Sequence, residues 1–496
     1  MTIVEMLERN AKLLPEKTAI VYGDSKISYR EFYERSNMLA NFLITNGLKN
    51  GERVGLLVQK TPEAIISFLG VAAAGGTVFP IDYTQTVSHI KLVLDITDPA
   101  FLIVDESFQP LLSKIKPSCL NEKIIVIGKK RVKKYRNWHK IFDKKEISPP
   151  EVSLQDSDVV YLNFTSGTTG MPKGAITTHA NIFWNTLASV GSLKLRHDDI
   201  HLCMFPVFVH PHELFSRPLY LGGTIVLIDN ISPKSIAKRI TDCRVTCMMA
   251  VASIYDTLVR LHDSFPFDFS SLRIPESGGM HINPGLAKRF EERFGIKITP
   301  VWGSTETSGI ALAGSVNEAN KTGSMGKPCS YYEVRILGED GEELPENEIG
   351  EMAVRGPAVC SGYYNQPEET EKYIKDGWFF SGDMVKKDTE GYFYFASRKS
   401  GMMKMAGLKV FPTEIEDVLI THPKIDEVAV VKIQDHSHGE VPKAVIVLKD
   451  ASKISKSDIK KFCEEKMSKY KVPRIIEFMN ALPRTSGGKI RYRELV

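Results

Sequence analysis

Hydroxyl and glycine residues gather in one short segment that ends with a lysine. After the strand-like run 161–164 come, in order, Thr165, Ser166, Gly167, Thr168, Thr169, Gly170, Met171, Pro172, Lys173 and Gly174. Glycine lets the backbone turn so that its N–H groups face an anion, and the hydroxyls add further donors. Lys173 supplies a positive charge. The segment therefore predicts a loop that binds nucleotide phosphates.

This loop is not a Walker A motif. That motif requires Gly-Lys followed by Ser or Thr, whereas Lys173 stands between Pro172 and Gly174. The structural alternative is a flexible surface turn. The hydroxyls and glycines follow an apolar strand directly, which favours the phosphate-binding interpretation.

A second group of chemically active residues follows the apolar run 298–301. It consists of Trp302, Gly303, Ser304, Thr305, Glu306 and Thr307. The Glu306 carboxylate is a hard oxygen ligand, which suits the divalent ion that neutralises nucleotide phosphates. The alternative is the start of a helix with Ser304 or Thr305 as its N-cap. Taken alone, the segment does not decide between the two.

Together these segments resemble the adenylate-forming superfamily, which includes acyl-CoA synthetases, adenylation domains of peptide synthetases and luciferases. The resemblance continues in order from residues 54–81 to the end of the chain. It implies an acyl-CoA synthetase that uses ATP and Mg²⁺ to convert a carboxylic acid into an acyl-adenylate. The acyl group then passes to the thiol of coenzyme A.

The resemblance also implies roles for the two segments. Residues 165–169 and Lys173 are expected to hold the β- and γ-phosphates, and Trp302 to Thr305 to contact the nucleotide. Glu306, with Thr165, is expected at the metal ion. An adenine-side turn is expected at Gly279, Met280 and His281. The family commonly has small residues or proline where Met280 and His281 stand.

The last third of the chain matches further family motifs. Asp383 takes the place of the ribose-binding carboxylate, which can accept hydrogen bonds from both hydroxyls, and Arg398 that of a second ribose or phosphate contact. Lys489 takes the place of the adenylation lysine, where a cation stabilises charge as pyrophosphate departs. Without this context, Lys489 is a surface lysine in a frayed tail.

In the resembled family the C-terminal domain rotates between the two half-reactions. The rotation is expected to replace Lys489 by a face around Lys404 and Gly407, with Gly407 where pantetheine passes the backbone. The hinge position usually holds Asp or Lys, and here it is Ser400 followed by Gly401. A Ser-Gly pair is conformationally permissive, so rotation is still expected.

The expected acyl pocket is open and apolar. Gly303 stands where acetyl-specific relatives carry a tryptophan that shortens the pocket, so we expect an acid larger than acetate. Phe208 and Val209 suggest an apolar wall, and Val209 occupies the usual histidine position. His210 lies one residue on and is the candidate to replace that histidine. A metal site formed by residues 210–213 is disfavoured because Pro211 separates the ligands and no partner cluster follows.

The elements that must position these residues follow an α/β rhythm. Apolar runs at 54–58, 78–81, 124–127, 224–228 and 246–251 predict buried strands, and a helix is predicted over 61–74. Short strands separated by turns predict a small β-rich subdomain over about 325–399. We expect a large N-terminal domain of stacked α/β sheets, residues 1–399, and a mobile α+β C-terminal domain, residues 400–496.

Composition is that of a globular protein with no strong electrostatic partner. The chain has 496 residues, and its 64 basic and 60 acidic residues give a formal net charge of +4. The basic run 129–134 lacks interleaved aromatic residues, so nucleic acid is not expected. The seven scattered cysteines indicate a reducing compartment. With neither a secretory signal nor a membrane-spanning run, we expect a cytoplasmic monomer or homodimer.

Three other functions compete with the acyl-CoA synthetase. An adenylation enzyme that loads an acyl carrier protein would share the first half-reaction. A luciferase-like oxygenase is compatible with the scaffold, but no residue specifically indicates it. A non-catalytic nucleotide sensor is disfavoured because binding alone would not need the lysine at 489. The particular acid, whether medium-chain, branched, cyclic or aromatic, is not decided by the sequence.

Overall fold

The chain divides into two compact units. Unit 1 comprises residues 1–333 and 354–379, and unit 2 comprises residues 334–353 and 380–496. The computed structural model describes residues 1–496 except 116–122, 129–133, 144–145, 167–170, 229, 263–264, 266, 279–283, 317–320, 406–407, 436–438, 450–451 and 485–489; at 166, 284, 404, 408, 409 and 439 it describes only the backbone. The predicted boundary at 399/400 concerns the part that rotates and stays a prediction.

Unit 1 contains a seven-stranded sheet in the order β7-β6-β5-β3-β4-β8-β9. All of its neighbouring strands are parallel except β8 and β9, which form an antiparallel hairpin. Its elements are β3 (Arg53–Leu57), β4 (Thr77–Pro80), β5 (Phe101–Asp105), β6 (Ile124–Ile127), β7 (Arg136–Asn137), β8 (Val159–Ser166) and β9 (Pro172–Thr178), with helices α3 (Pro62–Ala73), α4 (Val87–Thr97) and α5 (Gln109–Ile115).

A second sheet of unit 1 has nine strands in the order β16-β15-β14-β13-β12-β10-β11-β1-β2. Its centre is parallel, and β2, β15 and β16 are antiparallel to their neighbours. The strands are β1 (Thr18–Tyr22), β2 (Ser25–Ser28), β10 (Ile200–Cys203), β11 (Thr224–Leu227), β12 (Cys247–Ala250), β13 (Ile274–Ser277), β14 (Thr299–Ser304), β15 (Gly309–Ala313) and β16 (Lys327–Pro328).

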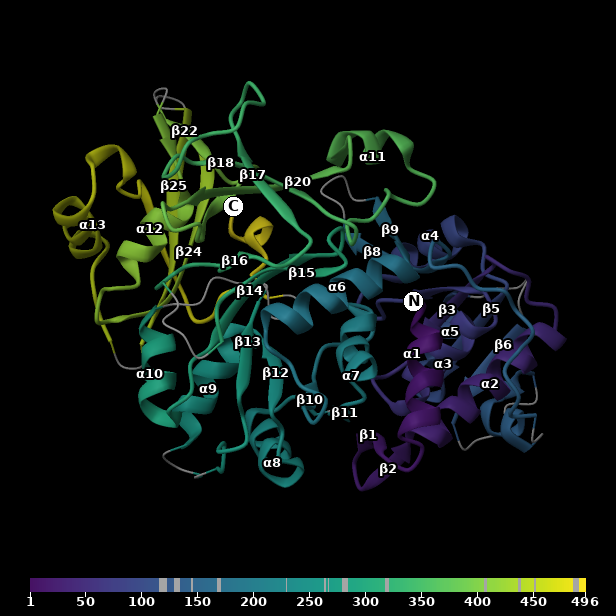
Figure 1. The fold of residues 1–496 in the computed structure, drawn as a ribbon. Helices are drawn as coiled ribbons and strands as arrows, with labels where there is room; N and C mark the ends of the chain where they lie inside the picture. The colour runs from purple at the N-terminus through teal and green to yellow at the C-terminus, as the bar shows by residue number, and fades with distance from the viewer. Residues whose placement is uncertain are drawn as a thin grey trace. The chain divides into compact units, whose positions relative to one another are not determined.

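Helices cover both sheets of unit 1. The helices α8 (Pro233–Cys243), α9 (Ala252–His262) and α10 (Pro284–Phe294) pack beside β10 to β13, as Figure 1 shows. The remaining helices of this unit are α1 (Ile3–Leu13), α2 (Tyr29–Thr45), α6 (His179–Ser192), α7 (Ser216–Leu221), α11 (Pro367–Tyr373) and the 3₁₀ turns η1 (Glu106–Phe108), η3 (Trp138–Asp143) and η4 (Pro211–Leu214).

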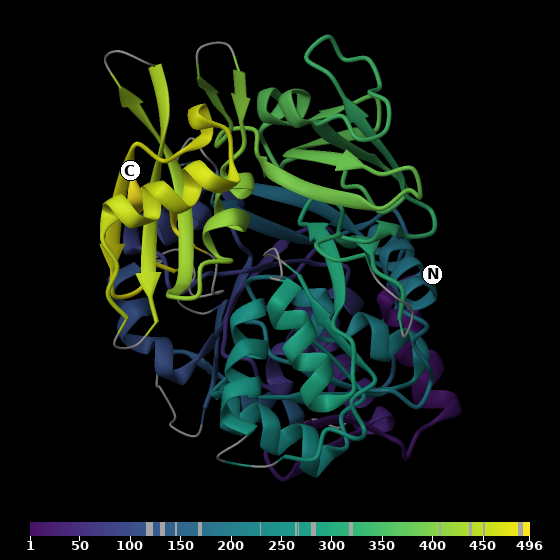
Figure 2. The same cartoon turned by 90° about the vertical axis from the view of Figure 1, so that its left-hand side faces the viewer.

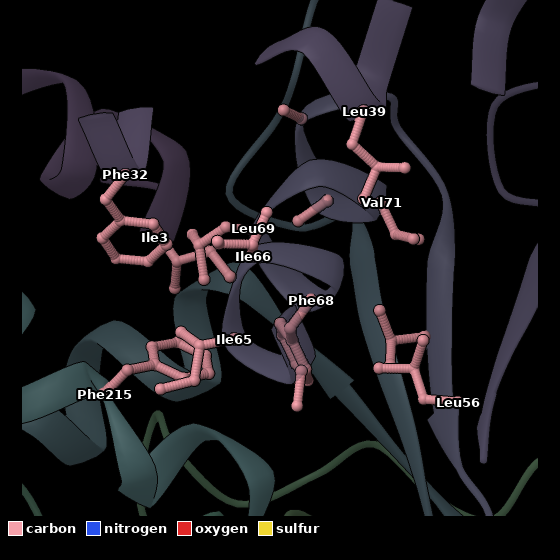
Figure 3. Close-up of a cluster of buried hydrophobic side chains, with 14 of the residues drawn as sticks. Ile3, Phe32, Leu39, Leu56, Ile65, Ile66, Phe68, Leu69, Val71 and Phe215 are labelled. Atoms are coloured by element: carbon pink, nitrogen blue, oxygen red, sulfur yellow. The ribbon is translucent and has the colours of Figure 1, made fainter. Parts of the chain in front are cut away.

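The central core of unit 1 is built around α3. This helix begins after Thr61 with Pro62 at its first position, as the sequence predicts, and apolar residues on every side of it are buried. Phe68 and Leu69 contact the same cluster as Ile3, Phe32 and Phe215, which come from other elements (Figure 3). The cluster also contains strand residues of both sheets, so one core joins them. A helix that is apolar all round belongs in such an interior.

The boundary between the units passes through a five-stranded sheet, β17-β18-β20-β19 with β21 on β20. Its strands are β17 (Glu333–Leu337), β18 (Gly350–Arg355), β19 (Ile374–Lys375), β20 (Trp378–Lys387) and β21 (Phe393–Arg398). β20 has ten residues and is longer than the short strands that the sequence predicts in this region. Its second half pairs with β21, a partner that the local sequence pattern does not indicate.

The C-terminal part of unit 2 is an α+β layer, which confirms the expected fold class. Residues of α12 and α13 share a cluster with one face of the sheet, and Figure 2 shows α13 lying against the strands. The opposite face carries Ala429 and Val431, as the two-residue period of a strand requires. The elements are β22 (Met403–Met405), β23 (Leu408–Val410), α12 (Pro412–Leu419), β24 (Ile425–Asp435), β25 (Gly439–Leu448), α13 (Lys456–Lys466), η5 (Lys469–Lys471), β26 (Ile475–Met479) and η6 (Tyr492–Leu495).

Among the described residues, no helix is both long enough and apolar enough to cross a lipid bilayer.

Candidate active site

The predicted phosphate loop connects the two strands of the β8–β9 hairpin. Thr165 is opposite Lys173 and Ser166 is opposite Pro172 in the antiparallel register. The hairpin therefore brings the first hydroxyl and the lysine of the motif side by side. Thr165 is half-buried. Gly167, Thr168 and Thr169 lie outside the described residues, and Ser166 is described only by its backbone.

Lys173 is buried in unit 1 among partners that the sequence does not predict. Only 5% of the residue is exposed, and its ammonium forms an ion pair with Glu369. The nitrogen also lies over two aromatic rings, 4.1 Å from the ring centre of Tyr373 and 5.5 Å from that of Tyr363. A desolvated ammonium is stabilised by a carboxylate and by ring faces. A phosphate that binds Lys173 must therefore replace or join Glu369 as its counter-ion.

Tyr363 connects Lys173 to Glu306. Its hydroxyl donates a hydrogen bond of 2.6 Å to Glu306 Oε1, while its ring faces the Lys173 ammonium. Burial and the Glu306 carboxylate raise the pKa of Tyr363, so the phenol stays protonated and remains a donor. The structure thus brings together two residues from separate sequence motifs. Sequence reasoning missed Tyr363, Glu369 and Tyr373, because no local pattern marks their partners.

The segment 302–307 contains the end of β14, which finishes at Ser304, and the start of the turn that leads to β15. The Ser304 amide donates to Thr307 Oγ1 at 2.9 Å, and the Thr307 amide donates to Ser304 Oγ at 3.2 Å. β15 begins two residues later, so the alternative of a helix N-cap is wrong. Trp302 is half-buried on β14, and Thr305 is buried in the turn. The carbonyl of Glu306 accepts from the Cys360 amide at 2.8 Å, which anchors the turn.

Close packing against a neighbouring strand requires glycine at position 303. A Cβ atom at this position would lie 2.3 Å from the carbonyl oxygen of Gly309 and 2.9 Å from Ile310 Cα. These contacts arise where β14 and β15 pair with a shifted register next to Gly303. No side chain fits there unless the backbone moves. The close strand contact accounts for this glycine by itself, and an open acyl pocket at this position stays a prediction.

The predicted acyl wall is anchored in unit 1. Phe208 is buried, and its ring meets Tyr83 edge-on with ring centres 5.0 Å apart. The Val209 carbonyl accepts a hydrogen bond of 3.0 Å from the Asn163 side chain on β8. His210 immediately precedes η4. The wall is thereby connected to the strand that carries the start of the phosphate loop.

His212 is a fixed neutral histidine. Its Nε2 donates to the Ser308 carbonyl at 2.9 Å, and its Nδ1 accepts from the Tyr161 hydroxyl at 2.6 Å, because a carbonyl can only accept. Burial lowers the pKa of His212 to about 4. Both ring nitrogens are engaged in hydrogen bonds, so His212 offers no free nitrogen to a metal ion. Ser308 has a positive φ of 50°, a strained backbone that orients this carbonyl.

In unit 2 the two predicted ribose contacts meet directly. Asp383 and Arg398 are opposite each other on β20 and β21, and Arg398 Nη1 lies 3.0 Å from Asp383 Oδ1. Only 2% of the Asp383 side chain is exposed, against 62% for Arg398. The Arg398 guanidinium also donates to the Ser381 carbonyl at 3.2 Å. The pair presents one carboxylate and one exposed guanidinium group.

Several predicted residues fall outside the described part of the chain. These are Gly279, Met280, His281, Gly407 and Lys489; of Lys404 only the backbone, on β22, is described. The chain on either side of 485–489 is held by a bridge between Arg484 and Ile490. Ser400 lies in a turn closed by a hydrogen bond of 2.9 Å from the Gly401 amide to the Arg398 carbonyl.

Comparison with known proteins decides the family. Residues 7–364 match the AMP-binding enzyme family, and residues 414–489 match the AMP-binding enzyme C-terminal domain. The chain belongs to the AMP-binding enzyme family. This AMP-binding enzyme is 31% identical to a feruloyl-CoA synthase of Amycolatopsis sp, over 97% of this chain and 96% of that protein. It is 30% identical to a long-chain-fatty-acid–CoA ligase of Bacillus subtilis (strain 168), over 100% of this chain and 94% of that protein.

Solved structures agree with the sequence comparison. An anthranilate CoA ligase in complex with anthranoyl-AMP superposes on this AMP-binding enzyme with a TM-score of 0.93 and 29% identity, covering 100% of this chain and 96% of that chain. The expected membership of the adenylate-forming superfamily is therefore confirmed. The enzyme is an AMP-forming acid–thiol ligase, an acyl-CoA synthetase that uses ATP, Mg²⁺ and coenzyme A.

The carboxylates of Glu306 and Asp383 in the AMP-binding enzyme suit Mg²⁺ and a nucleotide, respectively. Tyr363 engages Oε1 of Glu306, and the second carboxylate oxygen is a hard ligand of the kind that Mg²⁺ prefers. Asp383 can accept hydrogen bonds from ribose hydroxyls while Arg398 balances its charge. Bound Mg²⁺ would supply neutralisation of the phosphate charge.

Proposed function

We propose that this acyl-CoA synthetase activates acids larger than acetate, in the medium-chain, cyclic or aromatic range. Two of its relatives are named for aromatic acids, a feruloyl-CoA synthase and an anthranilate CoA ligase, and another is named for long-chain fatty acids. In this chain Gly303 stands where acetyl-specific relatives carry a tryptophan, and the buried Phe208 belongs to the predicted apolar wall. A pocket of this kind accepts bulk that acetate lacks.

The proposed mechanism assigns most of the work to positioning and charge. Lys173 and residues 165–169 would orient the β- and γ-phosphates, and Glu306 would hold the metal ion that neutralises their charge. The acid's carboxylate attacks the α-phosphorus, and pyrophosphate leaves. Lys489 stabilises the charge on the reacting oxygens, as a preorganised cation does. The thiol of coenzyme A then attacks the acyl carbon and releases AMP.

One observation carries the assignment of these roles. Lys173 and Glu306 come from motifs more than a hundred residues apart, yet both contact Tyr363, through its ring and its hydroxyl respectively. A phosphate-binding lysine and a metal-binding carboxylate must lie close together to serve one triphosphate. Their shared neighbour is what such a site requires.

The proposal is tested by ATP–pyrophosphate exchange over a panel of acids. The panel contains acetate, octanoate, cyclohexanecarboxylate and benzoate at equal concentration. We expect exchange with at least one larger acid and at most a few per cent of that rate with acetate. Comparable exchange with acetate would refute the size assignment, and exchange that needs no acid would favour a nucleotide sensor.

The final acceptor is tested separately. We expect thioester formation with free coenzyme A, and none with a phosphopantetheinylated carrier protein at equal concentration. The reverse preference would make this chain a carrier-loading enzyme.

We further propose that the reaction takes place in the cytoplasm. Every cysteine in the described part of the chain is a free thiol, as a reducing compartment favours.

A further inference from the structure

A small polar cavity lies inside unit 1 next to the predicted acyl wall. It has a volume of about 30 Å³ and is lined by residues of β10, η4, α7, β12 and β13. Its polar lining residues are His201, His210, Glu213, Arg217 and Glu276, and we call this space the polar cavity. A volume of this size holds one water molecule or one small polar group.

The charged residues that line the polar cavity are two carboxylates and one arginine. Arg217 Nη1 donates to both carboxylate oxygens of Glu276, at 3.0 and 2.9 Å, so these two residues form a closed pair. Glu213 is a second carboxylate, 3.8 Å from Arg217 Nη2, which is too far for a hydrogen bond. The cavity therefore has one more acidic than basic group.

Two buried nitrogen atoms at the polar cavity have unmet hydrogen-bonding capacity. Neither Arg217 Nη2 nor His201 Nε2 has a hydrogen-bond partner among the described residues, and the two residues are only 5% and 6% exposed. Buried polar atoms are normally paired, and leaving one unpaired costs its full desolvation. These atoms indicate that the cavity receives a polar group from elsewhere.

The polar cavity adjoins the region where the acyl chain is expected. His210 belongs to both the cavity and the predicted acyl wall. Glu213 Oε1 lies 2.6 Å from the place where a Cβ atom of Gly309 would be, and the Gly309 carbonyl abuts Gly303. Gly309 therefore lies between Glu213, which lines the cavity, and Gly303.

We propose that the polar cavity is the far end of the acyl pocket and binds a neutral hydroxyl group on the acid, remote from its carboxylate. This inference rests on the proposed function. A hydroxyl can accept a hydrogen bond from Arg217 and donate one to Glu213, which matches the donor and the acceptor present. A second carboxylate would meet the excess negative charge of Glu213. An apolar end would leave Arg217 Nη2 buried and unpaired.

A metal ion is a poorer occupant. Asp199, His201 and Cys247 have potential ligand atoms within 4.8 Å of one another. Asp199, however, already pairs with Arg273 at 2.5 Å and accepts from Thr246 at 2.7 Å. Burial first, and then the positive charges of Arg217 and Arg273, lower the pKa of His201, although Asp199 acts in the opposite direction. The positive charges of these two arginines disfavour a cation at this cluster.

The test compares matched acids in ATP–pyrophosphate exchange. One series is octanoic, 8-hydroxyoctanoic and octanedioic acid, and the other is benzoic, 4-hydroxybenzoic and terephthalic acid. In at least one series we expect kcat/KM for the hydroxy acid to exceed that of its parent by about tenfold or more, because a buried site rejects analogues that leave it unpaired. The diacid should be the poorest substrate.

Two variants locate the effect at the polar cavity. Glu213→Gln removes the excess charge and should reduce discrimination against the diacid by about tenfold. Arg217→Lys keeps the charge opposite Glu276 but removes Nη2, and should abolish the hydroxyl preference. Glu31→Gln, on the surface of α2, is the matched control, and thermal unfolding verifies that each variant folds. If Arg217→Lys does not fold, Glu213→Gln still decides.

The outcomes separate the two proposals. Exchange in which parent acids equal or exceed their hydroxy forms in both series would overturn the hydroxyl proposal and leave the proposed function standing. A wild-type hydroxyl preference that Glu213→Gln leaves unchanged, with the diacid still rejected, would also overturn it. If no acid supports ATP–pyrophosphate exchange, including the acids of the first panel, the proposed function is overturned. The hydroxyl proposal then falls with it.

Discussion

At the scale of single residues, Tyr363 is the least expected member of the candidate site. Its ring faces Lys173 and its hydroxyl holds Glu306 at 2.6 Å, so one side chain contacts both a phosphate-binding and a metal-binding candidate. A partner that hydrogen-bonds a metal ligand fixes its orientation and tunes its basicity. Tyr363 is therefore a positioning residue for Glu306.

Tyr363→Phe removes the hydroxyl and keeps the ring over Lys173. We expect the apparent affinity for Mg²⁺ in ATP–pyrophosphate exchange to fall about tenfold, as loss of a partner of a metal ligand does. The measurement is a Mg²⁺ titration at saturating acid. Tyr373→Phe is the control, because it preserves the other ring beneath the ammonium. An equal loss in both variants would show that the hydroxyl does not act through Glu306.

At the scale of elements, the pairing of β14 with β15 determines what Gly303 can be. A Cβ atom at Gly303 would meet the backbone of β15 at 2.3 Å, and backbone cannot move aside as a flexible side chain can. Overpacking of this kind commonly costs about 1–3 kcal/mol. β15 begins at Gly309, directly after Ser308. The Ser308 carbonyl contacts His212, and the Cβ position of Gly309 lies next to Glu213.

Gly303→Ala is expected to lower the free energy of unfolding by about 1–3 kcal/mol, measured by urea denaturation. Gly191→Ala is the matched control. Gly191 lies in the last turn of α6, and an added Cβ atom there would meet no other atom within 4 Å. Alanine should leave stability unchanged or raise it by up to about 1 kcal/mol. If Gly303→Ala behaves like this control, the close strand contact does not constrain the position.

The elements could largely be predicted from the sequence because their signals are local. The apolar run at Ile124–Ile127 is β6, and Thr61 with Pro62 marks the start of α3. The extension of β20 could not be predicted, since it depends on pairing with β21. Strand pairing is a contact between separate segments, and hydrophobic periodicity does not report it.

Site residues that belong to a continuous sequence motif could be predicted. Site residues that come from distant segments and meet only in the fold could not. The positions of Lys173 and Glu306 follow from their motifs, and the facing of Asp383 and Arg398 agrees with their expected common role. The Glu369 partner of Lys173 is nearly two hundred residues away and belongs to no recognised motif. Charged and aromatic side chains on surface helices are too common for such a partner to stand out.

At the scale of the whole molecule, two faces of the C-terminal domain are expected to serve the two half-reactions. Lys489→Ala should abolish ATP–pyrophosphate exchange but spare thioester formation from supplied acyl-AMP, because the lysine stabilises charge only while pyrophosphate departs. Lys404→Ala is the reciprocal variant, expected to spare exchange and slow thioester formation. Both half-reactions are measured for both variants. Equal loss of the two half-reactions in Lys489→Ala contradicts the assignment.

Three buried histidines are expected to make the stability of unit 1 depend on pH in the acid range. Burial lowers the pKa of His179 to about 4, of His201 to about 3 and of His212 to about 4. All three lie in unit 1. Each is neutral in the folded chain, whereas an unfolded histidine takes up a proton near pH 6.5. Below that pH the unfolded state binds more protons, so stability falls as the pH is lowered.

We therefore expect the free energy of unfolding of unit 1 to fall between about pH 6.5 and pH 4. Each of the three histidines should contribute on the order of 3 kcal/mol to this decrease. Urea unfolding at pH 7, 6 and 5 measures this slope, with tryptophan fluorescence as the signal because Trp138 is buried in unit 1. His179→Gln removes one titrating group and should flatten the slope, whereas His139→Gln, at an exposed position, should not. Identical slopes in the wild type and His179→Gln would mean that His179 does not stay neutral inside the fold.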